Sequence, residues 1–219
     1  MNKDQEVQER ILAAAGKRFF TEGFTTVTMD DMARELGMSK KTLYRLFASK
    51  DELLRAVMQR FVAEVEAATD QILENPDTNC LSKLHRLLGF IAMQMLRIRP
   101  PFLLDLQRSA HPIWAELDEW RRRRVISKFA VLIEQGVAEG VFRNDLNKEL
   151  LLRMYTLLIQ GIVNPEVLSQ LPLTAHQAFE HVSKVFFEGV LTERARTEQA
   201  LSLSTTEPGE ENSSVWRFS

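Results

Sequence analysis

Cysteine is almost absent from this sequence, and its scarcity excludes several classes of protein at once. The one cysteine among 219 residues, Cys80, has no partner for an intramolecular disulfide and cannot form a cysteine-based zinc site. The first six residues also lack the apolar core of a signal peptide. We therefore expect the chain to work in the reducing environment of the cytoplasm.

Glycine, proline and long hydrophobic runs are scarce as well. With 9 glycines and 7 prolines, the composition excludes a collagen or a low-complexity scaffold. No uninterrupted apolar run reaches the roughly 18 residues of a membrane span, since even 150–163 contains Arg153 and Gln160. We expect no membrane partner. Because the formal net charge is −2, any contact with nucleic acid must come from a local basic patch.

The residue patterns of catalysis and metal binding are missing from the sequence. It has no glycine-rich phosphate loop, no Gly-x-Ser-x-Gly motif and no recognisable acid/base pair. Its four histidines include no pair at the i, i+4 spacing of a helical metal site. We therefore expect neither an enzyme nor a metal site, and the sequence predicts no cofactor.

Helical periodicity, by contrast, runs along almost the whole chain. Val7, Ile11, Ala15 and Phe19 recur every four residues, and no segment shows the alternation of a strand between hairpin turns. The sequence therefore predicts an all-α fold.

Two short predicted helices, 29–36 and 40–47, are joined by a tight turn that contains Gly37. Thr28 and Ser39 precede them as N-cap residues. Two short helices on a glycine turn are the geometry of a helix-turn-helix, whose second helix enters the major groove of DNA.

The second of these helices has a basic outward face. At 100° per residue, Leu43 and Phe47 point inward, whereas Lys41 and Arg45 point outward. The segment 38–50 holds four basic residues and no acid. Such residues bind phosphates and base edges. A solvated basic helix is the alternative, but the caps, the glycine turn and the inward pair favour a DNA-reading helix.

This part of the sequence resembles the tetracycline-repressor (TetR) family of bacterial regulators. The resemblance covers 10–58, and its most specific parts read FFTEGF, TMDDMA, LGMSKKTLYRLF and SKDELL from residues 19, 28, 36 and 49. It implies an all-helical homodimer that binds double-stranded DNA at a palindromic operator. The residues that it assigns to DNA contact are Thr28, Lys40, Lys41, Thr42, Tyr44, Arg45 and Lys50.

The resemblance also implies a domain order. We predict an N-terminal three-helix helix-turn-helix DNA-binding domain over 1–50, with a fourth helix linking onward from about residue 50. A C-terminal helical domain for effector binding and dimerisation follows over 51–192. Because 204–214 contains no apolar residue, we expect 193–219 to be a disordered tail.

A small-molecule effector site is predicted among large, adaptable side chains of the C-terminal part. The candidates are Met93, Met95, Phe102, Trp114, Phe129, Met154 and Tyr155. Few uncharged polar residues accompany them, so a hydrophobic or aromatic effector is expected, with core packing as the alternative role of each side chain. An arginine turned inward could bind a carboxylate on the effector; the polar candidates are Arg97, Arg99, Gln107, Arg108 and His111.

A homodimer interface is predicted on two other helices. The segment 150–163 is apolar nearly all round, whereas one stripe would suffice to pack a helix on its own domain. We expect the surplus to meet its symmetry mate together with the last helix. The predicted interface residues are Leu151, Tyr155, Leu158, Ile162, Phe179, Phe186 and Phe187.

The leading hypothesis is a transcriptional repressor that releases a palindromic operator when a small hydrophobic or aromatic effector binds. One alternative is an effector-independent regulator or an activator. A second is a helical small-molecule-binding protein that does not use DNA, against which the basic face of 40–45 argues.

Overall fold

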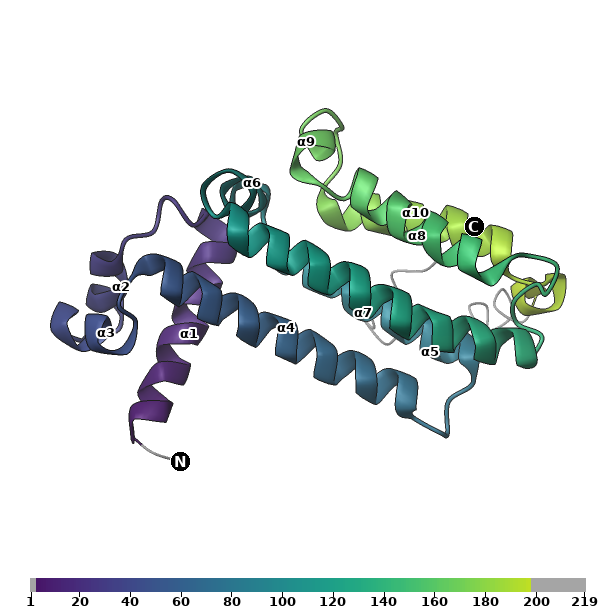
Figure 1. Cartoon of the computed structure of the whole chain (residues 1–219), viewed down its shortest axis with the longest axis horizontal. Coiled ribbons are helices and arrows are strands. Elements are labelled where there is room, and N and C mark those ends of the chain that lie inside the picture. Colours follow the sequence, from purple (N-terminus) through teal and green to yellow (C-terminus); the bar gives the residue numbers. More distant parts are fainter. Residues whose placement is uncertain (1–2, 198–219) are drawn as a thin grey trace, which may run out of the picture. The chain divides into compact units, whose positions relative to one another are not determined.

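The computed structural model describes residues 3–197 of the chain, and every regular element within them is an α-helix (Figure 1). The all-α prediction is confirmed. The helices are α1 (Lys3–Glu22), α2 (Met29–Glu35), α3 (Lys40–Leu46), α4 (Lys50–Glu74), α5 (Cys80–Arg97), α6 (Pro100–Ser109), α7 (His111–Ala138), α8 (Lys148–Ile162), α9 (Pro165–Leu168) and α10 (Ala175–Val190).

The chain divides into two compact units. The first comprises Met1–Ala68 and Leu96–Trp120, and the second comprises Thr69–Met95 and Arg121–Ser219. The division falls within helices α4, α5 and α7.

The first unit has a core shared by α1, α2, α3 and the start of α4. Ile11, Met32, Leu43 and Leu53 have no exposed surface. Phenylalanine rings extend this core: Phe20 packs edge-on against Phe61 and Phe102, at 5.5 and 5.0 Å between centroids, and Phe19 packs likewise against Phe24. These contacts form the hydrophobic core against which the helix-turn-helix packs.

The α2–α3 pair is set by its caps and by one glycine. Thr28 and Asp31 form a reciprocal capping box at the start of α2, and Ser39 Oγ accepts a hydrogen bond from the Thr42 amide at the start of α3. Between the helices Gly37 has φ +63°, in the left-handed region that favours glycine. The connection between the two helices therefore spans only residues 36–39, and Leu43 lies buried in the core.

The second unit is built around aromatic packing between α7, α8 and α10. Tyr155 lies 4.7 Å from Phe129, 5.0 Å from Phe186 and 5.3 Å from Phe187, centroid to centroid. Its hydroxyl shares a 3.0 Å hydrogen bond with Ser183, and burial raises its pKa. This cluster packs α8 against α10, and the two helices run side by side in Figure 1.

The chain after α10 is tied back to the turn that follows α7. An isolated antiparallel bridge joins Phe142 to Leu191, and the Thr192 hydroxyl donates to the Gly140 carbonyl at 2.8 Å. Residues 193–197 continue as helix, with Ala195 buried, so order extends past the point where the tail was expected to begin. The remainder of the predicted tail, 198–219, lies outside the described residues.

Candidate nucleic-acid interface

Helix α3 presents a polar, basic face to solvent. Lys41 and Arg45 are exposed, and the Tyr44 side chain is 46% exposed, whereas Leu43 on the opposite side is fully buried. Within the described residues, neither the Lys41 amino group nor the Tyr44 hydroxyl has a hydrogen-bond partner. The face therefore offers donors that an external ligand is free to engage.

Two cations of α3, Arg45 and Lys40, are paired with carboxylates of the same chain. The Arg45 guanidinium donates two hydrogen bonds to Asp4 of α1, at 3.0 and 3.2 Å. Lys40 forms an ion pair with Asp30 of α2. Both pairs are exposed, so their net stabilisation is small and a phosphate group can replace the carboxylate.

Lys50 is held at the first turn of α4. Its ammonium donates to the Thr25 carbonyl at 3.2 Å and lies 4.4 Å from the centre of the Phe24 ring. Burial lowers the pKa of Lys50, while the charges of Asp105 and Asp51 oppose that shift. The two contacts fix the position of this charge instead of leaving it on a freely moving side chain.

The two predicted threonines already serve the ends of helices. The Thr28 hydroxyl accepts from the Asp31 amide at 3.1 Å and donates to the Asp31 carboxylate at 2.5 Å. That exchange lowers the pKa of Asp31. Thr42 shares a 2.8 Å hydrogen bond with the Ser39 hydroxyl. Their fixed positions at the N-terminal ends of α2 and α3 suit contact with a phosphate, which helix N-termini favour.

The comparisons with known proteins point to one family. Residues 11–57 match the family model described as bacterial regulatory proteins, tetR family. YvaF of Bacillus subtilis (strain 168), an HTH-type transcriptional regulator, is 29% identical over 184 residues, covering 84% of this chain and 95% of its own. The chain is a TetR-family transcriptional regulator.

One further relative is similar in sequence, and one solved structure is similar in fold. The HTH-type transcriptional repressor KstR2 of Mycolicibacterium smegmatis is 26% identical over 149 residues, 67% of this chain and 72% of its own. A transcriptional regulator from Cytophaga hutchinsonii shares the fold with a TM-score of 0.67 at 19% identity, covering 84% of this chain and 98% of that one. The TetR-family matching region, 11–57, contains α2 and α3 complete.

The residues predicted for the effector site of this TetR-family regulator do not surround a single cavity. Phe102 is buried against Phe20 in the first unit, and Phe129 and Tyr155 are buried against other rings in the second. Trp114 and Met95 are half-buried, whereas Met93 and Met154 are 47% and 44% exposed. Phe102, Phe129 and Tyr155 thus pack in the core, and the effector site stays a prediction.

Two cavities in the described chain have other walls. One, of about 320 Å³, lies in the first unit between α1 and α4, with Arg97 at its edge. The other, of about 630 Å³, is an apolar groove between α8 and α10, and Met154 is the predicted effector residue that lines it. Of the predicted polar candidates, Arg97 lines the first cavity; Arg99, Arg108 and His111 are exposed, and Gln107 is half-buried.

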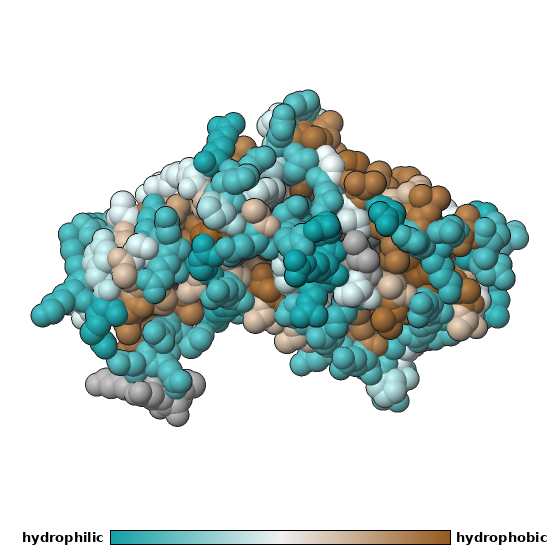
Figure 2. Space-filling view, viewed as in Figure 1, coloured by the Kyte–Doolittle hydropathy of each residue, from teal (hydrophilic) through white to brown (hydrophobic). Residues whose placement is uncertain are grey.

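The predicted dimer residues divide according to the phase of their helices. Leu151, Tyr155, Phe179, Phe186 and Phe187 are already covered within one protomer, while Ile162 is half-buried and Leu158 is 37% exposed. The apolar side chains left open on α8 and α10 share only Leu158 with the predicted set: they are Leu150, Met154, Leu157, Leu158 and Val185. Figure 2 shows hydrophobic surface gathered where Figure 1 places these helices.

Sequence reasoning missed the acidic partners of the interface. Asp4 and Asp30 were not connected with Arg45 and Lys40, and no spacing rule links residue 4 to residue 45. Asp105 of α6 was also missed, although its carboxylate holds the turn before α2. These are contacts between distant segments, and a single sequence carries no local signal for them.

Among the described residues, no group of three His, Cys, Asp or Glu side chains converges as a metal site requires. No single described helix is both long and apolar enough to cross a membrane, although α5 and α6 taken together reach the required length and hydropathy. Cys80 is fully buried, and burial raises the pKa of its thiol to about 12.

Proposed function

We propose that this TetR-family regulator is a homodimeric repressor of the bacterial cytoplasm, released from a palindromic operator by a small hydrophobic or aromatic effector. The observation that carries the proposal is the outward face of α3, where Lys41, Tyr44 and Arg45 stand exposed above a buried Leu43. A rigidly seated helix with a basic outer face is the element that a helix-turn-helix protein inserts in the major groove. The relatives include the repressor KstR2, which matches 67% of this chain, and the activator FasR of Mycolicibacterium smegmatis, which matches 34%, so the longer match favours repression.

The proposed DNA contacts divide into two groups. Thr28 and Lys50 lie at the starts of α2 and α4, where fixed donors suit phosphates. Lys40, Lys41, Thr42, Tyr44 and Arg45 lie on α3 or at its start and contact bases or phosphates of the groove.

The proposed dimer uses the open apolar face of α8 and α10. Leu157 is 67% exposed and Val185 is 74% exposed, and together with the groove between the helices they form surface that a monomer would leave in water. A two-fold axis across this face brings two copies of α8 and α10 into a four-helix interface. To read a palindrome, this dimer needs its two α3 helices to reach successive major grooves, about 34 Å apart.

Release requires no chemistry beyond binding. An effector that binds one dimer shape more tightly than the other shifts the population toward that shape. If the favoured shape no longer matches two successive grooves, the operator is lost, and the difference in effector affinity sets the extent of control.

The test is recovery of the operator. Random double-stranded DNA is passed over the purified full chain, and the retained fraction is sequenced, with the double variant Lys41→Ala/Arg45→Ala as the matched control. A palindrome enriched by the parent and lost by the control supports the proposal. Equal enrichment by both proteins would remove α3 as the reading helix. A single unrepeated half-site would contradict the two-fold dimer.

The direction of control is tested on the recovered operator. A reporter gene placed behind it should be silenced by the regulator and relieved by an effector. Activation of the reporter, or silencing that no compound relieves in a screen of aromatic acids, fatty acids and cationic drugs, would favour the alternative of an activator or an effector-independent regulator.

A further inference from the structure

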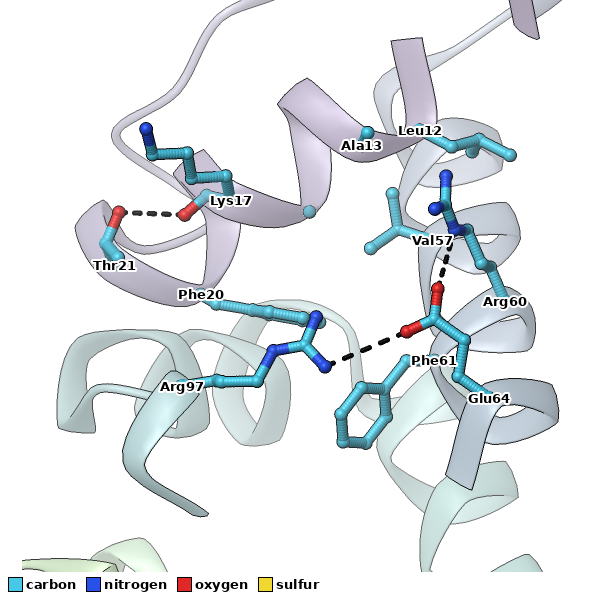
Figure 3. Close-up of a pocket in the computed structure, with 11 residues that line it drawn as sticks. Leu12, Ala13, Lys17, Phe20, Thr21, Val57, Arg60, Phe61, Glu64 and Arg97 are labelled. Carbon is cyan, nitrogen blue, oxygen red and sulfur yellow. Dashed lines mark hydrogen bonds and ion pairs between the residues drawn. The ribbon is translucent and has the colours of Figure 1, made fainter. Parts of the chain in front are cut away.

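The cavity between α1 and α4 combines an apolar floor with a cationic edge. Phe20 of α1 and Val57 and Phe61 of α4 supply the apolar side, and all three are buried residues of the first unit. Arg60 and Arg97 stand at the polar side, and Lys17 also lines the cavity but extends away from them (Figure 3). The cavity holds about 320 Å³, at the small end of the range of roughly 300–1,000 Å³ found for ligand pockets.

Two guanidinium groups in this cavity converge on one carboxylate. Glu64 accepts a 2.8 Å hydrogen bond from Arg60 Nε, and its other oxygen lies 3.7 Å from Arg97 Nη1. Figure 3 shows the Arg60 and Arg97 side chains pointing at Glu64 from two sides. Arg60 also pairs with Glu9 at 2.8 Å. The arrangement shows that a carboxylate fits between the two arginines, because the chain has placed one of its own there.

The contact between Arg97 and Glu64 is longer than a direct hydrogen bond between a guanidinium and a carboxylate. At 3.7 Å it is an ion pair that is too long for a hydrogen bond, whereas a guanidinium and a carboxylate in direct contact lie about 2.7–2.9 Å apart. The Arg97 guanidinium also lies 5.8 Å from the centre of the Phe61 ring, so it borders the apolar floor. A ligand that lies on Phe20 and Phe61 therefore ends beside Arg97.

The charges of the residues that line the cavity favour a ligand with a negative charge. The lining residues carry three cations, Lys17, Arg60 and Arg97, and one acid, Glu64, while Glu9 outside the lining also pairs with Arg60. A cationic ligand would meet like charge, and a neutral one that displaced Glu64 would not replace the ion pair that Arg97 loses. We propose that this cavity binds a small amphipathic carboxylate, its apolar part against Phe20 and Phe61 and its carboxylate on Arg97, in place of the contact from Glu64.

The site touches both helices that flank the DNA-reading helix. α1 carries Asp4, which holds Arg45, and α4 begins at Lys50. A ligand wedged between α1 and α4 therefore alters the spacing of the two helices on which α3 rests. Its use as an effector site depends on the proposed function, whereas its occupancy by a carboxylate does not.

The binding test uses octanoate as the probe, titrated calorimetrically into the full chain without DNA. Inorganic phosphate tests a bare anion and 1-octanol tests an apolar chain without charge. We expect octanoate to bind more tightly than either. Arg97→Gln should weaken octanoate about tenfold or more while changing 1-octanol little, because only the charged end loses its partner. Arg99→Gln, a neighbouring exposed arginine outside the cavity, is the matched control and should bind as the parent does.

Two further variants place the ligand in this cavity. Ala13 is an exposed lining residue, so Ala13→Phe should fill the space and abolish binding of both octanoate and 1-octanol without a buried substitution. Glu64→Gln removes the competing carboxylate and should tighten octanoate. Thermal unfolding of each variant confirms that it is folded.

Several outcomes would overturn the proposal. These are no octanoate binding up to about 10 mM, unchanged binding in Arg97→Gln and Ala13→Phe, or phosphate binding as tightly as octanoate. Gel-shift titration on the recovered operator is a separate arm: a failure of all DNA binding there contradicts the proposed function but leaves the calorimetric result standing.

Discussion

The carboxylate of Asp105 accepts two hydrogen bonds from Thr25, one from its backbone amide at 2.7 Å and one from its hydroxyl at 2.8 Å. Asp105 belongs to α6, and Thr25 lies in the turn between α1 and α2. The fit is close, since a Cβ on Gly23, which has φ +95°, would stand 2.8 Å from Asp105 Oδ2. One side chain of α6 thus fixes the turn that leads into the helix-turn-helix.

Asp105→Asn should lower the free energy of unfolding by about 1 kcal/mol, because the neutral amide loses the charge-assisted part of two hydrogen bonds. It should also weaken operator binding, because the start of α2 is held less firmly. Urea unfolding and gel-shift titration measure the two effects. Thr25→Ala, which removes only the hydroxyl donor, is the control and should lower the free energy of unfolding by a smaller amount. A variant as stable as the parent would show that the turn does not need this carboxylate.

Lys41→Ala should weaken operator binding and leave the melting temperature nearly unchanged, because the side chain is exposed and forms no hydrogen bond or ion pair within the described chain. Titrations at several salt concentrations distinguish the two kinds of contact. A lost phosphate contact lowers the salt slope by about 1 per half-site, whereas a lost base contact costs about 1–3 kcal/mol and relaxes specificity at one position. Full-strength binding with an unchanged slope would place Lys41 outside the interface.

Asp4→Asn should raise operator affinity a few-fold, because the Arg45 guanidinium no longer has to exchange a carboxylate for a phosphate. Glu6→Gln, which removes the same charge from the same turn of α1, is the matched control. Operator titration at one fixed ionic strength gives the comparison. If both variants bind the operator more tightly to the same extent, the loss of one negative charge explains the effect and the pairing of Asp4 with Arg45 does not. If neither variant binds more tightly, Asp4 does not compete with DNA for Arg45.

Gly37→Ala and Gly89→Ala should change stability in opposite directions. At Gly37 the φ of +63° is strained for any L side chain even though the space is open, so alanine should cost about 1 kcal/mol and weaken operator binding. Gly89 lies within α5 with nothing within 4 Å of a Cβ, so alanine should stabilise by up to about 1 kcal/mol. Chemical unfolding measures the stability of both variants. If both substitutions stabilise the protein, or both destabilise it, the difference in backbone conformation does not determine the effect.

Leu157→Glu combined with Val185→Glu should convert the proposed dimer to a monomer, because four charges would be placed in one apolar interface. Sedimentation at micromolar concentration reads the change in mass. Val131→Glu is the control, since Val131 is 59% exposed on α7 and lies outside the proposed interface. A parent protein that sediments as a monomer, or a double variant that remains a dimer, would contradict the use of this face.

Short-range rules predicted the N-terminal part of the fold well. The caps at Thr28 and Ser39, the turn at Gly37 and the burial of Leu43 all depend on residues within a few positions of one another, and all are as expected. Helical phase was predicted less well on α8. That helix is apolar nearly all round, so its sequence alone could not distinguish the buried Tyr155 from the exposed Leu157.

Long-range relationships could not be predicted at all. The pairing of Asp4 with Arg45, the hold of Asp105 on Thr25 and the meeting of Arg97 with Glu64 join segments 33 to 80 residues apart. Each depends on how helices pack, which periodicity does not encode. The aromatic residues predicted for the effector site could not be assigned from the sequence for a related reason. A ring that lines a cavity and a ring that fills a core occur at the same helical spacing.

Gly136, near the end of α7, packs directly against two side chains of the second unit. A Cβ on Gly136 would stand 2.3 Å from the Phe142 ring and 2.8 Å from Cys80 Sγ, so the turn that follows α7 is held by a ring and a thiol that lie against bare backbone. None of these three residues lines either of the two cavities described above. This part of the scaffold can therefore stay constant while the residues around a cavity change, because its packing does not depend on what a cavity binds.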